Sequence, residues 1–189
     1  MQQFLSPSNM LIVMAPQHQI GNAFPLVVPG ADVRRDLYLL LACTLGSKRY
    51  AELTNGFDYS PLQNLKVEFE QAEIGRLLLS LAVRIRVLED RGHVSRATMQ
   101  RSCGVLEVGT DKTPLSLREA CNKVVHASSA QFQIAFLDEF DSTLPSPTSD
   151  HLEPRMLLIG CKGKVTWQAT LNLVELANAA IEAPAIRDA

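Results

Sequence analysis

The sequence lacks the short signatures that reveal the chemistry of many proteins of this size. Its four cysteines are scattered without a C-x-x-C pair, and its four histidines show no zinc-ligand spacing. There is no glycine-rich phosphate-binding loop and no internal repeat, and no apolar run approaches the length of a membrane span. The apolar stretch at residues 10–15 has no basic segment before it, so it does not resemble a signal peptide. We therefore expect a reduced, cytoplasmic protein that needs neither metal nor cofactor and does not bind a membrane.

Composition and length describe an ordinary globular chain. Of its 189 residues, 47% are apolar and 20% are charged, and the formal net charge is −2. A chain of this length can bury a core without disulfides or metal ions. The net charge excludes the strong overall basicity that draws many proteins to nucleic acid. These values predict a single domain over residues 31–189, preceded by an irregular arm at residues 1–30 that is rich in Pro, Gln and Asn.

Two long helices are predicted from apolar residues at helical spacing, over residues 32–53 and 65–90. Residues Val67, Ile74, Leu78, Leu81, Ile85 and Leu88 hold one face of the second helix. Further apolar residues, among them Leu79 and Val83, widen that surface well beyond a stripe. Such width predicts a central helix with neighbours on more than one side.

The middle of the chain allows both a short helix over residues 95–101 and an extended segment over residues 105–108. A third long helix then begins between residues 114 and 117 and ends near residue 127. Its start is indicated either by Thr113-Pro114, as N-cap and first helical residue, or by a capping box from Ser116 to Glu119.

The period then changes to alternation. A strand is predicted over residues 132–136, a loop over residues 141–154, and a hairpin at about residues 155–171 that turns at Lys162-Gly163. Trp167 is interpreted as the core anchor of that hairpin. With a last helix capped by Asn172, these elements predict a mainly α fold. Its core resembles a four-helix bundle, with a small antiparallel hairpin before the last helix.

Arg118, Asn122 and His126 are spaced four residues apart in the third helix and form a ladder along it. A helical wheel places Leu117, Ala120, Cys121, Val124 and Val125 on the buried side, and His126 almost opposite its centre. His126 is then either an exposed residue that gains from the helix dipole, or part of a cleft or subunit interface.

The ladder has the chemistry that RNA cleavage requires, because His can transfer protons near neutral pH and Arg can hold a phosphate. Arg118 and His126 are two helical turns apart, about 12 Å along the backbone. One helix therefore cannot bring them together. Two copies that run antiparallel across a two-fold axis would do so.

The run from Asn122 to His126 resembles part of the signature of HEPN-domain proteins, which are helical bundles. Their signature has an Arg, a polar residue such as Asn and a His, and many of them are metal-independent ribonucleases of toxin–antitoxin and defence systems. In this chain Cys121 stands where the signature has Arg, and Arg118 is displaced. The resemblance implies a homodimer with Arg118, Asn122 and His126 as catalytic residues.

Six arginines between residues 76 and 101 suggest an RNA-binding surface, to which Arg84, Arg86 and Lys123 would contribute. The favoured alternative is a solvated helix face whose arginines pair with acidic residues one or two turns back. Two functional hypotheses follow. The first is a HEPN-like ribonuclease, or a degenerate relative, of bacterial or phage defence. The second is a non-catalytic, dimeric interaction module that binds a protein partner.

Overall fold

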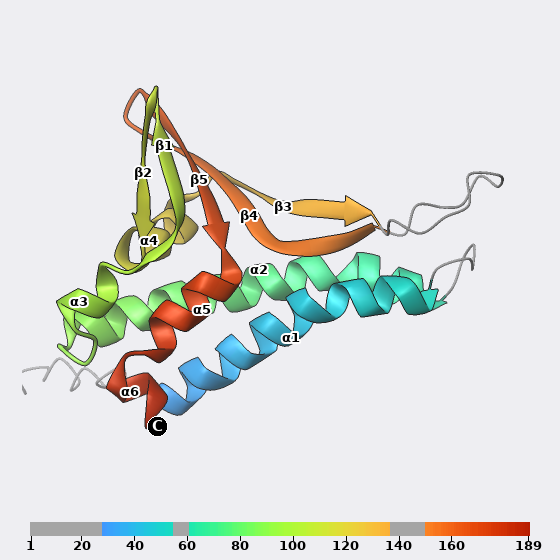
Figure 1. Cartoon of the computed structure of the whole chain (residues 1–189), viewed down its shortest axis with the longest axis horizontal. Helices are drawn as coiled ribbons and strands as arrows, with labels where there is room; N and C mark the ends of the chain where they lie inside the picture. The colour runs from blue at the N-terminus through green and yellow to red at the C-terminus, as the bar shows by residue number, and fades with distance from the viewer. Residues whose placement is uncertain (1–27, 55–60, 137–149) are drawn as a thin grey trace, which may run out of the picture.

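The computed structural model describes residues 28–54, 61–136 and 150–189, which form a layer of helices beneath an antiparallel sheet (Figure 1). Residues 1–27, most of the predicted arm, lie outside the described residues. So do residues 137–149, which include most of the predicted loop.

Two long helices, α1 (Gly30–Thr54) and α2 (Pro61–Asp90), run antiparallel along the base of the molecule (Figure 1). Both predicted helices are confirmed. The buried residues of α1 recur at alternating spacings of three and four, so one narrow stripe of this helix faces the interior. The Ser80 hydroxyl donates a hydrogen bond of 3.0 Å to Asp36, which fixes the pairing of the two helices near the start of α1.

The sheet has five strands in the order β2-β1-β5-β4-β3, and all neighbouring strands are antiparallel. The strands are β1 (Ser102–Val108), β2 (Asp111–Ser116), β3 (Ser129–Phe136), β4 (Asp150–Lys162) and β5 (Val165–Asn172). The turn at Lys162-Gly163 lies where it was predicted, and Gly163 has a φ of +63°. The hairpin that it closes is the centre of the sheet.

The predicted mainly α fold with a four-helix bundle-like core is therefore wrong. Helices take up 57% of the described residues and strands 29%, so the sheet is a full layer of the fold. Two local patterns caused the error. Pro114 reads as a first helical residue but lies in β2, at the edge of the sheet, where a missing N–H costs no ladder bond. The segment from Asp150 to Pro154 reads as loop but begins β4.

The remaining helices are α3 (Arg96–Met99), α4 (Leu117–His126), α5 (Leu173–Ile181) and α6 (Pro184–Arg187). The predicted third helix, now α4, starts at the Ser116 cap, and the predicted Asn172 cap of the last long helix is also confirmed. Both alternatives for the middle of the chain occur, because α3 is short and helical and β1 is extended.

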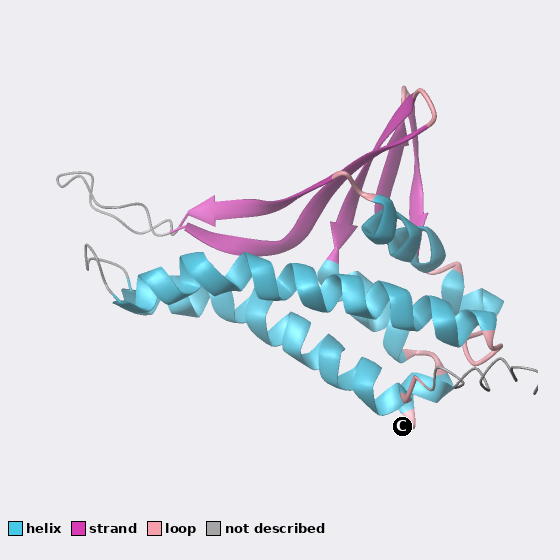
Figure 2. Cartoon of the chain, turned by 180° about the vertical axis from the view of Figure 1, so that it is seen from behind, coloured by secondary structure: helices cyan, strands magenta, loops and turns pink. Residues whose placement is uncertain are grey.

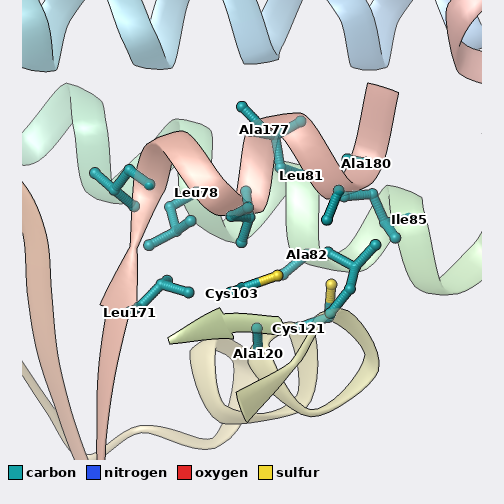
Figure 3. Close-up of a cluster of buried hydrophobic side chains, with 14 of the residues drawn as sticks. Leu78, Leu81, Ala82, Ile85, Cys103, Ala120, Cys121, Leu171, Ala177 and Ala180 are labelled. Atoms are coloured by element: carbon teal, nitrogen blue, oxygen red, sulfur yellow. The ribbon is translucent and has the colours of Figure 1, made fainter. Parts of the chain in front are cut away.

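The helices cover one side of the sheet, and the hydrophobic core lies between the helices and the sheet (Figures 1 and 2). On β5, Trp167, Ala169 and Leu171 are buried whereas Thr166 and Gln168 are exposed, so alternate residues face the helices. Figure 3 shows side chains of α2, α4 and α5 meeting in this core. None of the helices that the structure describes is both long and apolar enough to cross a bilayer.

Two cysteines belong to this core. Cys103 and Cys121 are fully buried and point into the same cluster of side chains (Figure 3). Burial raises the pKa of each thiol to about 12. Since the thiolate is the reactive form, both behave as small apolar side chains in the folded protein.

Candidate functional site

Helix α4, which carries the ladder, is fixed by its cap and by one buried side. The Ser116 hydroxyl accepts a hydrogen bond of 3.3 Å from the Glu119 amide. Leu117, Ala120 and Cys121 are fully buried against α2 and the sheet. Val125, which the wheel placed on the buried side, is 41% exposed. The buried stripe of α4 is therefore narrower than predicted.

The structure does not bring the ladder residues together. Arg118 extends toward α2 and forms an ion pair with Glu89, with 2.5 Å between Nη1 and Oε1. Asn122 is half-buried, and His126 is exposed at the last residue of α4, as its place on the wheel predicted. The Arg118 guanidinium is therefore already bound to a carboxylate within its own chain.

The residues predicted to bind RNA are also engaged inside the fold. Arg84 contacts Asp32 at 3.6 Å and Asp36 at 3.3 Å, both on α1. Arg86 pairs with Glu89 at 2.5 Å and more distantly with Asp90. These pairs support the alternative of an arginine-rich face balanced by acidic residues. Arg76 pairs with Glu73 one turn back, as that alternative predicted, whereas the partners of Arg84 and Arg86 lie on α1 or further along α2.

Lys123 has a different role. Its ammonium lies 4.3 Å from the ring centroid of Trp167, and Trp167 is 4% exposed. The wheel placed Lys123 on the polar face of α4, but the helix lies so close to β5 that the lysine covers the indole ring. This contact attaches α4 to the sheet.

A polar cluster that sequence analysis missed lies where β4 begins, against α1 and α2. Lys66, with a side chain only 6% exposed, donates a hydrogen bond to the Asp150 carbonyl, and its ammonium lies 3.6 Å from the Asp150 carboxylate. Ser47 accepts a hydrogen bond of 2.9 Å from the Leu152 amide. Among the described residues, His151 Nδ1 is buried with no hydrogen-bond partner. These groups connect segments 84 and 105 residues apart, so no local pattern could have revealed them.

Glu70 belongs to the same cluster and has a raised pKa. Burial of the carboxyl is the main cause, and the nearby Ser47 hydroxyl and Lys66 ammonium act in the opposite direction. A carboxyl whose pKa is raised by folding opposes folding when it is ionised.

We expect Glu70→Gln to stabilise the protein at neutral pH, because glutamine resembles the protonated carboxyl. The gain should disappear as the pH falls below the ordinary pKa of a glutamate, where the folded and unfolded states both carry a protonated carboxyl. Urea unfolding followed by circular dichroism over a series of pH values measures this. The exposed Glu68→Gln serves as control, and a Glu70→Gln gain that is the same at every pH contradicts the argument.

A second feature is the surface of α1 and α2 that faces away from the sheet. Along α2, residues Leu65, Phe69, Ala72, Arg76, Leu79 and Val83 are spaced by four and three in turn, and we call them the outer stripe. Its four large apolar members are between 44% and 53% exposed. Beside Leu65 and Phe69 there is a cavity of about 440 Å³, which Ala42 and Gly46 of α1 also line.

The outer stripe accounts for the apolar width of α2 that the sequence shows. That width predicted neighbours on more than one side, and the core and α1 cover only part of it. Large apolar side chains at this spacing on an open helix face are typical of a surface that another helix covers.

In the described part of the chain, no three His, Cys, Asp or Glu side chains come close enough together to hold a metal ion. Comparison of the chain with models of protein families, with characterised proteins and with solved structures gives no match.

Proposed function

We propose that this protein is a non-catalytic interaction module that binds a helix of a protein partner on the outer stripe of α2. The observation that carries this proposal is the second apolar seam of α2, at the spacing used in helix pairing and on the side away from the core. An amphipathic helix recognises such a surface through apolar residues at matching intervals.

The surroundings of the outer stripe fit a helical partner. Ala42 and Gly46 are small residues of α1 beside it, and a Cβ placed on Gly46 would have no neighbour within 4 Å among the described residues. Small residues let another backbone approach closely. The one charged residue of the outer stripe, Arg76, forms two hydrogen bonds with Glu73, of 2.8 Å and 2.5 Å, so its charge is balanced within α2.

The proposal is tested by site-specific photo-crosslinking in cells that make the full-length protein. A benzoyl-phenylalanine at position Ala72 should form protein adducts, identified by mass spectrometry, that Leu79→Glu abolishes. The same group at Asp111, the exposed first residue of β2, is the matched control and should not form them. Equal yields at the two positions, or no adduct at Ala72, would contradict the proposal.

The non-catalytic part of the proposal makes a separate prediction about RNA. Because Arg118 is held by Glu89 and Lys123 lies on Trp167, we expect purified wild-type protein to leave mixed RNA intact. His126→Ala should give the same result, as judged by gel electrophoresis after prolonged incubation. Degradation by the wild type that His126→Ala removes would instead favour the HEPN-like ribonuclease.

A further inference from the structure

The residues of the outer stripe form three pairs that are placed symmetrically about residue 74. Counted from residue 74, Leu65 and Val83 each lie nine residues away, Phe69 and Leu79 five, and Ala72 and Arg76 two. When two copies of α2 run antiparallel about a two-fold axis level with residue 74, each residue lies opposite the other member of its own pair. Each such pair of facing residues forms one layer of the interface, and the layers from Leu65 to Val83 extend over about 27 Å of helix.

Each of these layers is chemically matched. Leu65 lies against Val83 of the second copy, and Phe69 lies against Leu79, so exposed apolar side chains cover one another. In the central layer the long Arg76 lies against Ala72, the smallest side chain of the stripe. The hydrogen bonds to Glu73 satisfy the Arg76 guanidinium, so its aliphatic stem can cover Ala72 while its charge stays paired.

A glycine borders the outer stripe at the level of the axis, about 80° around the helix from the centre of the stripe. Gly75 is in the middle of α2, and a Cβ built on it would have no neighbour within 4 Å in the part of the chain that the structure describes. Glycine in the middle of a helix costs roughly 0.5–1 kcal/mol relative to alanine. No contact among the described residues requires this glycine, and its lack of a side chain leaves room for a second α2 on that flank of the outer stripe.

We propose that the occupant of the outer stripe is a second copy of this chain, bound α2 to α2 in the antiparallel register described above. This rests on the proposed function and names its partner. The interface differs from the one that the ladder of α4 would need, because it uses neither Arg118 nor His126.

The register is tested by placing opposite charges at Phe69 and Leu79, which it brings face to face. Phe69→Glu and Leu79→Lys, each alone, should raise the dissociation constant of the dimer by about 100-fold or more, because symmetry repeats each loss on both sides. In the double variant each new carboxylate would face a new ammonium of the other copy, and the dimer should return. Analytical ultracentrifugation over a range of concentrations measures this. Val165→Glu, at an apolar residue of the sheet that is 53% exposed like Phe69, should leave the dimer unchanged.

A crosslink tests the position of the axis. Gly75→Cys in a Cys161→Ser background should give a covalent dimer with a short bis-maleimide, because the two new thiols lie beside the axis. The Cys161→Ser parent shows how much crosslinking comes from the half-buried Cys43. Ala97→Cys, at an exposed residue of α3, is the control that should give no covalent dimer.

Wild-type protein that stays monomeric at every concentration would overturn this inference, as would single variants that weaken a dimer the double variant does not restore. A monomer in which the thiol of Gly75→Cys resists maleimide would mean that another part of the same chain covers α2 there, and would also overturn the inference. A monomer that still forms Ala72 adducts with another protein in cells would retain the proposed function and reject the second copy. A monomer without such adducts would reject both.

Discussion

Trp167→Ala is expected to lower the free energy of unfolding by about 3–5 kcal/mol, the range for removing a large aromatic side chain from a core. The indole is 4% exposed and lies on the central strand β5, near the turn that joins β5 to β4. It lies so close to Gly160 that a Cβ on that glycine would come within 2.2 Å of the ring, and Lys123 covers it from α4. The substitution would therefore leave a cavity between β4, β5 and α4.

Urea unfolding followed by far-ultraviolet circular dichroism measures this loss, since the variant has no tryptophan left for fluorescence. Trp167→Phe keeps most of the buried volume and should lose clearly less. Lys123→Met keeps the aliphatic cover and removes only the charge, so it separates the cation–π contact from packing. A loss below about 1 kcal/mol for Trp167→Ala would contradict the packing described here.

Gly104→Ala is expected to be at least as damaging. Gly104 has a φ of +148°, and a Cβ there would lie 2.0 Å from the carbonyl oxygen of Thr170 on the neighbouring central strand. The backbone strain alone costs on the order of 1–3 kcal/mol. Because the obstructing atom belongs to the backbone of β5, relief of the clash requires the two strands to separate.

The matched control for this variant is Gly109→Ala. Gly109 also has a positive φ, of +61°, but it lies in the exposed turn after β1 and has nothing within 4 Å of a Cβ position. It should lose only about 1–2 kcal/mol, from the left-handed backbone. Equal losses for the two variants in thermal unfolding would mean that the close approach of β1 to β5 has no part in the effect.

Local patterns predicted the local structure of this protein well. The helical periods of α1 and α2, the caps at Ser116 and Asn172, and the turn at Lys162-Gly163 each depend on residues near one another in the sequence. The sheet was underestimated because a proline in an edge strand has the same local signature as a proline at a helix start. The strand order depends on contacts between distant segments, such as that of Gly104 with Leu171.

In the candidate sites, too, local patterns predicted some features, whereas others depend on contacts between distant segments. The exposure of His126 follows from a helical wheel, and so does the excess apolar width of α2. The pairing of Arg118 with Glu89 depends on how α4 lies on α2, and the contact of Lys66 with Asp150 depends on where β4 begins. Neither could be predicted from spacing along the chain.

The strand order also affects the sequence of events during synthesis. Strand β5 lies between β1 and β4, yet it follows both of them in the chain. The hairpin of β1 with β2 and the pairing of β3 with β4 can form as these segments leave the ribosome, but their inner edges have no common strand until residues 165–172 emerge. Exposed strand edges pair readily with other chains. A nascent chain that pauses before β5 is therefore prone to aggregate through these unpaired edges.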